Sequence, residues 1–483
     1  MASLEAFAAC AKGGDNVLFE GPAGDDIRMT AADTRAIPLP HDALAAKGTH
    51  RLPFVIAASS AGTLIEFYDF YLYGVLAGFF AEHFFPGDLR NGFLFSLGIF
   101  WTGFVVRPLG AVLFGHLGDL IGRKYTFMLS LGLMGLATFL VGCLPTYESI
   151  GWLAPVLLVA CRVVQGVALG GEYGGAATYV AEHAPDGSRG FYTSWIQTTA
   201  TMGIVMALLV IMAFRVGLGD EAFTAYGWRF PFLLSAVLVV FAAYIRLKLA
   251  ESPLFTRLKE QGRASANPAR DTYSSGRNWG LMALALFGFT APMAVVWYTS
   301  QFYALAYLSN VLMIDYLTVY AVMAVALVLG SPFFIFWGWL SDRIGRRRIM
   351  TAGFVLAVVS YWPVFTWLGE YRDDPVMLTA LVWYMMILVT MVYGPLAAFL
   401  VELFPARIRY SSMSLPYHIG AGVFGGGVPF IATWLSGLVA GVPLIGLLYP
   451  MTIAGIGVVV SVLGLKRETH QVQIWAEVTA PKT

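Results

Sequence analysis

Twelve long apolar segments dominate the chain between residues 53 and 466. Each is about 20 residues long or longer, which is the length a helix needs to cross a hydrocarbon core of about 30 Å. With 58% hydrophobic and only 12% charged residues, the chain cannot hide this much apolar surface from water inside soluble domains. We therefore expect lipid to surround most of the protein. The segments lie near residues 54–80, 93–116, 127–145, 152–179, 190–214, 229–250, 280–308, 315–340, 350–369, 376–402, 412–438 and 442–465.

A polar stretch divides the twelve segments into two sets of six. We expect this stretch, residues 251–279, to be a cytoplasmic linker between two helical bundles, residues 53–250 and 280–466. Residues 1–52 mix acidic and basic residues with glycine and proline and lack the apolar core of a signal peptide, so they are predicted to be a disordered cytoplasmic tail. Residues 467–483 are predicted to be a second, shorter cytoplasmic tail.

Two sequence motifs occur in both halves of the chain. The first pair is Gly115-x-x-x-Asp119-x-x-Gly122-Arg123-Lys124 and, 223 residues later, Gly338-x-x-x-Asp342-Arg343-x-Gly345-Arg346-Arg347. The second pair is Glu182-x-x-Pro185-x-x-x-Arg189 and, at an offset of 220, Glu402-x-x-Pro405-x-x-x-Arg409. Because two independent motifs share nearly one offset, the sequence predicts an all-α polytopic membrane protein. Its twelve transmembrane helices are expected to form two pseudo-symmetric six-helix bundles of the same orientation.

The distribution of lysine and arginine sets the expected orientation. With the amino terminus inside the cell, the cytoplasmic connections hold sixteen of these residues and the opposite connections hold four. Because positively charged loops stay in the cytoplasm, both termini are predicted to be cytoplasmic. The expected location is the cytoplasmic (inner) membrane.

Seven further motifs resemble those of one transporter family. They are Gly62-Thr63-x-x-Glu66-Phe67-Tyr68-Asp69-Phe70, Arg107-Pro108-Leu109-Gly110, Arg162-x-x-Gln165-Gly166, Gly170-Gly171-Glu172-Tyr173-Gly174-Gly175, Gly227-Trp228-Arg229-x-Pro231-Phe232, Glu251-Ser252-Pro253 and Glu402-Leu403-Phe404-Pro405. Over residues 55–468 the chain resembles the metabolite:proton symporter family of the major facilitator superfamily, which includes permeases for α-ketoglutarate, citrate, shikimate and proline or betaine. The resemblance implies proton-coupled symport of a small mono-, di- or tricarboxylate by alternating access.

The chain departs from the family pattern at a few positions. Leu120 stands where the loop usually has a basic residue, and His418 stands where asparagine is expected. His418 is able to titrate, although a single interior histidine is more often satisfied by structural hydrogen bonds. The tail after Lys466 lacks the coiled-coil extension of osmosensing proline/betaine permeases, which disfavours an osmolyte role. A zwitterionic osmolyte symporter is nevertheless the alternative function, followed by a non-transporting membrane sensor.

Charged residues inside the apolar segments are few, and each is a candidate functional group. A charge at the bilayer centre costs about 2.5–3.5 kcal/mol on insertion scales, so it needs a partner or a function. Glu66 and Asp69 are three residues apart on one helix face, and two carboxylates so close in a low dielectric are expected to bind a proton. We predict that they form the proton-coupling site. A permanent salt bridge between one of them and an arginine is the structural alternative.

Arg107 and Arg162 are the predicted anchors for an anionic substrate. A guanidinium group binds a carboxylate through two parallel hydrogen bonds, which favours arginine for this role. Structural pairing with Glu66, Asp69 or Glu172 is the alternative. Polar side chains inside membrane spans turn away from lipid, so the substrate site is predicted to include four more residues. These are Gln165, Gln197, Tyr298 and Gln301.

The repeated loop motifs predict a gate on the cytoplasmic side. Ion pairs between the motifs of opposite halves would hold the halves together while this side is closed. In a wet loop each pair contributes about 0–1 kcal/mol, so a network of pairs can hold one state and still release it. The predicted gate residues are Asp119, Arg123, Glu182, Arg189, Glu251, Asp342, Arg346, Glu402 and Arg409.

Other classes of function are disfavoured. The chain has no Gly-x-x-x-x-Gly-Lys-Ser/Thr phosphate loop and no His-Glu-x-x-His zinc pair, so neither an enzyme nor an ATP-driven pump is expected. Its three cysteines have no metal-binding or disulfide spacing, and no metal or cofactor is predicted. A net charge of +1 offers nucleic acid no basic field. The expected partners are the lipid bilayer, a proton and a small organic acid, and the protein is expected to function as a monomer.

Overall fold

The computed structural model describes residues 16–20, 26–30, 52–85, 89–121, 123–171, 173–247, 272–405, 408–438, 444–465, 468–472 and 474. Its contacts divide the chain into two units, residues 1–51 and 52–483. Residues 251–271 of the predicted linker 251–279, among them Glu251, lie outside the described residues.

The described part of the first unit is a pair of antiparallel strands, β1 (Asn16–Glu20) and β2 (Asp26–Thr30). Asn16 pairs with Thr30 and Glu20 with Asp26. The composition of residues 1–52 predicts a disordered tail and does not anticipate this pair of strands.

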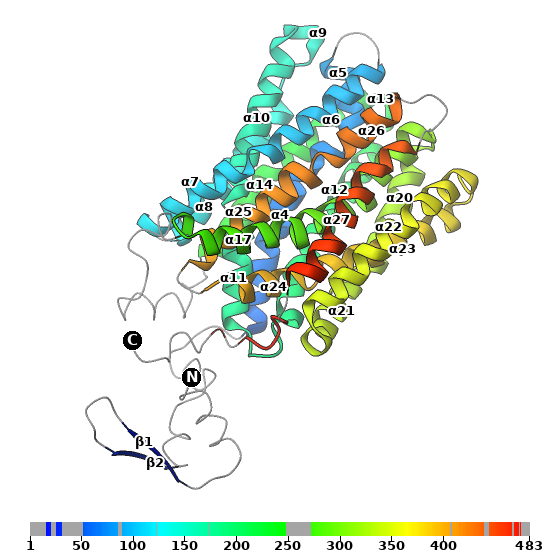
Figure 1. The fold of residues 1–483 in the computed structure, drawn as a ribbon. Coiled ribbons are helices and arrows are strands. Elements are labelled where there is room, and N and C mark those ends of the chain that lie inside the picture. The colour runs from blue at the N-terminus through cyan, green and yellow to red at the C-terminus, as the bar shows by residue number, and fades with distance from the viewer. Residues whose placement is uncertain are drawn as a thin grey trace. The chain divides into compact units, whose positions relative to one another are not determined.

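The second unit is built from long helices packed side by side (Figure 1). The first six apolar segments form the first bundle, in which α12 packs on α4, and α10 packs on α6, α7 and α8. The elements are α4 (Leu52–Val75), α5 (Ala77–Phe84), α6 (Leu89–Val105), α7 (Arg107–Ile121), α8 (Arg123–Cys143), α9 (Tyr147–Ile150), α10 (Leu153–Gly170), α11 (Tyr173–His183), α12 (Arg189–Leu218), α13 (Asp220–Ala222), the π-helix η1 (Phe223–Gly227) and α14 (Arg229–Leu247).

The last six segments form the second bundle, which contains several π-helical turns. Its elements up to the tenth segment are α17 (Gly276–Ala285), η2 (Leu286–Thr290), α18 (Ala291–Tyr298), η3 (Thr299–Tyr303), α19 (Ala304–Ala306), η4 (Tyr307–Val311), α20 (Tyr316–Gly330), α21 (Pro332–Ile344), α22 (Arg346–Glu370), α23 (Pro375–Tyr393) and α24 (Leu396–Leu403). The last two segments form α25 (Arg409–Ile419), η5 (Gly420–Gly425), α26 (Val428–Leu438), the 3₁₀ turn η6 (Ile445–Leu447) and α27 (Leu448–Gly464).

The helices account for the twelve predicted membrane segments. Within the described ranges, nine helices are long and apolar enough to span a membrane. Two more spans are bent pairs: α4 with α5 turns by 56°, and the α13–η1 segment with α14 turns by 61°. The remaining span is α8, which contains the shorter apolar stretch Met128–Cys143. The predicted all-α fold class is confirmed.

Local chemistry sets where several helices begin and break. The side chain of Asp374 accepts hydrogen bonds from the backbone N–H groups of Val376 and Met377 at 3.0 and 3.1 Å, which caps α23. Between α6 and α7 the helix breaks just before Arg107-Pro108. Because proline has no N–H group to continue the hydrogen-bond ladder, Arg107 is placed at the start of a new helix.

Glycines allow helices of the first bundle to touch through their backbones. A Cβ atom on Gly166 of α10 would lie 1.9 Å from the carbonyl oxygen of Gly103 on α6. One turn later, a Cβ atom on Gly170 would lie 2.2 Å from the carbonyl oxygen of Arg107. These two glycines therefore allow α10 to pack directly against the α6–α7 break, beside Arg107.

We predict that Gly166→Ala destabilises the folded protein, because the new methyl group meets backbone atoms that cannot rotate away. Overpacking of this kind costs about 1–3 kcal/mol or more. The control is Gly132→Ala in α8, where a Cβ atom meets nothing within 4 Å and where alanine favours the helix by up to about 1 kcal/mol. Thermal unfolding of the detergent-purified variants is the measurement. Equal melting temperatures for both variants would contradict the close backbone contact.

Candidate functional site

Six of the predicted gate residues form a gate cluster, defined here as Glu182, Arg189, Asp342, Arg346, Glu402 and Arg409. Glu402 on α24 is paired with Arg346 at 3.0 Å and with Arg189 of the first bundle at 3.4 Å. A second pair between the bundles joins Arg409 to Glu182 at 3.6 Å. The repeated motifs of the two halves therefore meet and hold each other at this end of the molecule.

Asp342 adds a different kind of contact between the bundles. Its two carboxylate oxygens accept hydrogen bonds from the backbone N–H groups of Gly190 and Phe191, each at 2.9 Å. These N–H groups belong to the first turn of α12, where the helix dipole favours negative charge. Asp342 also pairs with Arg346 at 2.6 Å. The carboxylate thus caps a helix of the opposite bundle while it orients an arginine of its own.

The gate cluster is buried, which corrects one expectation. The side chains of the Arg346–Glu402 and Arg189–Glu402 pairs are 0–1% exposed, so the estimate for pairs in a wet loop does not apply. In the interior, removing one partner of an ion pair leaves an uncompensated charge and costs about 3–5 kcal/mol. Of the other predicted gate residues, Glu251 and the side chains of Asp119 and Arg123 lie outside the described part of the chain.

A short carboxy-terminal strap, residues 465–474 where described, lies on the gate cluster. The guanidinium of Arg189 donates to the carbonyl oxygen of Val472 at 2.7 Å, and that of Arg347 donates to Leu465 at 2.7 Å. Glu468 pairs with Arg347 at 3.4 Å, and Ile474 is fully buried. The strap therefore contacts both bundles, although the sequence analysis predicts only a tail from residue 467.

Deeper in the first bundle, Arg107 and Arg162 form an arginine pair around one aromatic ring. Their guanidinium carbons lie 4.5 and 4.2 Å from the centre of the Phe70 ring. Arg107 also lies over Phe104 at 4.1 Å, and Arg162 over Tyr73 at 4.8 Å. Aromatic faces attract cations, so rings from α4 and α6 compensate part of the charge of two side chains that are only 2% and 0% exposed.

Neither arginine uses all of its hydrogen-bond donors. Arg162 donates through Nη1 to the carbonyl oxygen of Phe70 at 3.1 Å and to Oε1 of Gln165 at 2.7 Å. Gln165 in turn donates to the hydroxyl of Thr138 at 2.8 Å, which fixes its orientation. The Nε and Nη2 groups of both Arg107 and Arg162 have no hydrogen-bond partner among the described residues.

The two candidate coupling carboxylates are both interior. Glu66 is 1% exposed and Asp69 is 0% exposed. Asp69 lies one helical turn from Ile65, which packs on α8 and α14, and one turn from Tyr73, which bonds to Ser96 of α6. It therefore faces the inside of the first bundle. Within the described part of the chain neither oxygen of Asp69 has a hydrogen-bond partner.

The remaining predicted site residues lie where the two bundles meet. Gln197 donates to the carbonyl oxygen of Tyr393 at 3.1 Å, and Gln301 donates to the hydroxyl of Thr201 at 3.3 Å. Both amides therefore link one bundle to the other. The ring of Tyr298 packs edge-on against Phe104, with ring centres 5.1 Å apart, directly beside the arginine pair.

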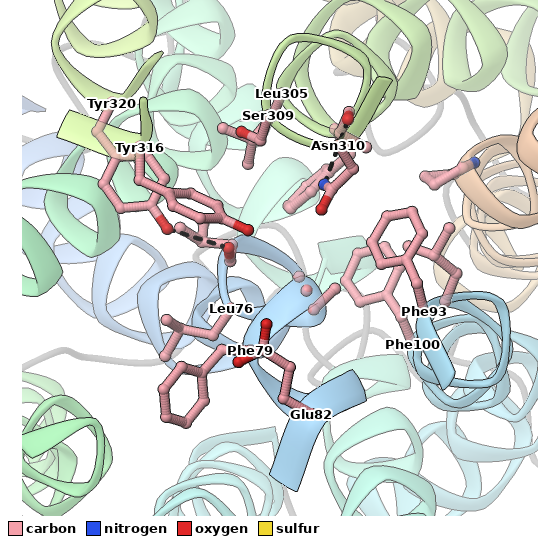
Figure 2. Close-up of a pocket in the computed structure, with 18 of the residues that line it drawn as sticks. Leu76, Phe79, Glu82, Phe93, Phe100, Leu305, Ser309, Asn310, Tyr316 and Tyr320 are labelled. Atoms are coloured by element: carbon pink, nitrogen blue, oxygen red, sulfur yellow. Dashed lines mark hydrogen bonds between the residues drawn. The ribbon is translucent and has the colours of Figure 1, made fainter. Parts of the chain in front are cut away.

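A cavity of about 170 Å³ is lined by residues at the end of α4 and in α5 of the first bundle and by residues of η4 and α20 of the second (Figure 2). Its polar lining includes Glu82, Asn310 and Tyr316. Its floor is formed by the rings of Phe100 and Phe302, whose centres are 5.0 Å apart. The other face of this floor touches the site, since Phe100 contacts Arg162 and Phe302 contacts Tyr298. Phe100 thus lines the cavity and also contacts one member of the arginine pair.

Comparison with known proteins identifies the family. Residues 60–417 match the sequence model described as Major Facilitator Superfamily. The chain belongs to the major facilitator superfamily. It is 35% identical over 399 residues to the alpha-ketoglutarate permease of Escherichia coli, covering 82% of this chain and 90% of that protein. It is 32% identical over 413 residues to the citrate-proton symporter of Klebsiella pneumoniae, covering 84% and 89%.

Solved structures give the same fold. The xylose transporter of E. coli in a partially occluded inward-open conformation superimposes with a TM-score of 0.66 at 16% identity, covering 86% of this chain and 98% of that one. The twelve-helix major facilitator fold, and the resemblance to the metabolite:proton symporters within this superfamily, are therefore confirmed. The protein is a polytopic membrane transporter.

Three polar residues of the cavity in this major facilitator transporter could not be found from the sequence. The cavity residues Glu82, Asn310 and Tyr316 carry no motif, and only their place in the folded bundles brings them together. Neither ring nitrogen of His418 has a hydrogen-bond partner among the described residues.

We predict that Glu402→Gln loosens the gate cluster, because it leaves Arg189 and Arg346 buried beside a neutral amide. The reactivity of a cysteine placed at buried Thr193 with a water-soluble maleimide, in a background without the three native cysteines, is the measurement. We expect labelling to accelerate at least about tenfold, which corresponds to about 1.4 kcal/mol. The control is Asp373→Asn, which removes an exposed pair with Arg372. Equal labelling of both variants would show that the gate cluster does not hold this end closed.

Proposed function

We propose that this transporter is a symporter that carries a small organic acid together with a proton across the inner membrane. The observation that supports this most directly is the arginine pair, two buried guanidinium groups with unused N–H donors around Phe70. Buried donors without partners are costly, and a substrate carboxylate would satisfy them. The names of the two bacterial relatives, an α-ketoglutarate permease and a citrate-proton symporter, support the same substrate class.

In this proposal each arginine has a separate supporting arrangement. Arg162 is oriented through the Gln165–Thr138 hydrogen bonds, which leave its Nε and Nη2 groups for the ligand. Arg107 is held at the first residue of α7 by the break before Pro108. Two guanidinium groups that share one ring can bind two carboxylates of one small molecule, or two edges of one carboxylate.

The proton is assigned to the carboxylates of α4, and first of all to Asp69. Uptake of an anion into a low-dielectric interior requires a compensating positive charge. A proton on Asp69 would supply that charge and leave Arg162 available to the substrate. After release of the substrate, the ionised carboxylate would attract the same arginine. Proton and substrate are thus coupled through competition for one guanidinium group. Glu66, which is also buried, is the second candidate for the proton.

Alternating access requires barriers that open in turn on the two sides of the site. We assign the gate cluster to the cytoplasmic side, because lysine and arginine accumulate in the connections at that end. Bundles 53–250 and 280–466, joined by a cytoplasmic linker at 251–279, would then rock about the arginine pair. The Phe100–Phe302 layer would be the thin barrier on the opposite side, below the cavity.

Uptake into proteoliposomes tests this function. We expect at least one labelled mono-, di- or tricarboxylate to accumulate when an inside-alkaline pH gradient is imposed, and the accumulation to collapse with a protonophore. Betaine and proline belong in the same panel. Entry of betaine with no entry of any acid would favour the osmolyte alternative, and a lack of all uptake would favour a non-transporting sensor.

We predict that Asp69→Asn abolishes accumulation driven by the pH gradient but spares exchange of labelled for unlabelled substrate, because exchange needs no net proton movement. Glu66→Gln is measured beside it. The matched control is Glu148→Gln, which neutralises an exposed carboxylate in α9. Full accumulation in both the Asp69 and Glu66 variants would exclude these carboxylates as the coupling device.

A further inference from the structure

His418 is a buried polar side chain with no role in the function proposed above. It lies in α25 of the second bundle and is 1% exposed. Both ring nitrogens lack a hydrogen-bond partner among the described residues, and the ring packs edge-on against Tyr417 at 5.2 Å. A neutral imidazole has one donor and one acceptor. Leaving such groups without hydrogen bonds in the interior is costly. A polar ligand that bonds to the ring would remove this cost.

The neighbours along the helix show which way the imidazole faces. Ser414, His418 and Gly422 are spaced four residues apart and lie on one side of the segment. The Ser414 hydroxyl approaches Gly174 of α11 so closely that a Cβ atom there would lie 2.2 Å away. A Cβ atom on Gly422 would lie 2.4 Å from the carbonyl oxygen of Phe104. This side of the segment therefore faces the first bundle, with His418 midway between the two contacts.

The part of the first bundle opposite His418 is the start of α7. Helix α25 packs on α7, and η5 packs on α6. Phe104, whose carbonyl oxygen faces Gly422, and Arg107 are three residues apart across the α6–α7 break. An arginine from one bundle and a histidine from the other, each with unused nitrogen groups, thus face the same interface.

The backbone on both sides of His418 is irregular. Pro416 lies inside α25 and cannot donate a backbone hydrogen bond, and its own carbonyl oxygen accepts one from Thr290 of η2 at 2.8 Å. The segment then continues as the π-helix η5 from Gly420. Single π-helical turns often occur at functional sites because they redirect side chains. The hydrogen bond from Thr290 anchors this irregular turn to its own bundle.

We propose that His418 is a substrate-binding residue of the second bundle, donating a hydrogen bond from its ring to a carboxylate held by Arg107. This inference rests on the proposed function and adds a contact that spans the two bundles. No lysine or arginine is buried at this depth in the described part of the second bundle, so an anion there depends on neutral donors such as the imidazole. The anion would then join the bundles across the site.

The test compares His418→Leu with His418→Asn. Leucine removes the donor, whereas the asparagine amide keeps one. With the labelled acid that the wild-type protein accumulates, we expect the KM of exchange to rise about 10- to 100-fold in His418→Leu, as for loss of a hydrogen bond to a charged group. The KM of His418→Asn should remain within several-fold of wild type. The stabilisation of each variant by the same acid, measured as a shift of melting temperature, should follow the same order.

The control is His183→Gln, a buried histidine at the gate end whose Nδ1 is already bonded to the carbonyl of Tyr179 at 2.7 Å. Its KM should equal that of the wild type. If His418→Leu lowers the maximal rate or the melting temperature without changing KM or the stabilisation by substrate, His418 has a packing role and the inference is wrong. Failure of the wild-type protein to accumulate any acid would instead overturn the proposed function itself.

Discussion

A charge buried in this molecule must be compensated by the protein, because neither lipid nor the apolar interior solvates it. The structure uses three levels of compensation. The gate cluster pairs each arginine with a carboxylate. The arginine pair receives only aromatic faces, a carbonyl and an amide. Asp69 receives no hydrogen bond from the described residues. The degree of compensation separates the groups that join the bundles from the groups that we propose to bind substrate and proton.

The contacts between the bundles suit two rigid bodies that move against each other. Glycines let backbones touch directly, as where Gly190 and Gly338 face each other's carbonyl groups. Polar links between the bundles include the two amides Gln197 and Gln301, the Asp342 cap on α12 and the ion pairs of the gate cluster. Each can break as a unit without unfolding a helix. Movement therefore requires the loss of a small set of defined contacts while each bundle keeps its own core.

The sequence predicts those features that depend on length, period or repetition. The spans follow from apolar length, and ion pairs between the halves follow from the repeated motifs. Features that depend on how helices cross could not be predicted. No spacing links Phe70 to Arg107 and Arg162, so the shared ring appears only after α4, α7 and α10 are packed. The burial of the gate cluster was missed for the same reason, because the closing surfaces come from the opposite bundle.

The strap at the carboxy terminus contacts both bundles within a few residues. Arg189 of the first bundle holds Val472, while Arg347 of the second holds Leu465. Separation of the bundles at this end stretches the intervening chain or detaches one of its ends. A fluorescent reporter attached to the strap would thus sense the conformational cycle from outside the translocation path, whereas a purification tag that displaces Ile474 would disturb it.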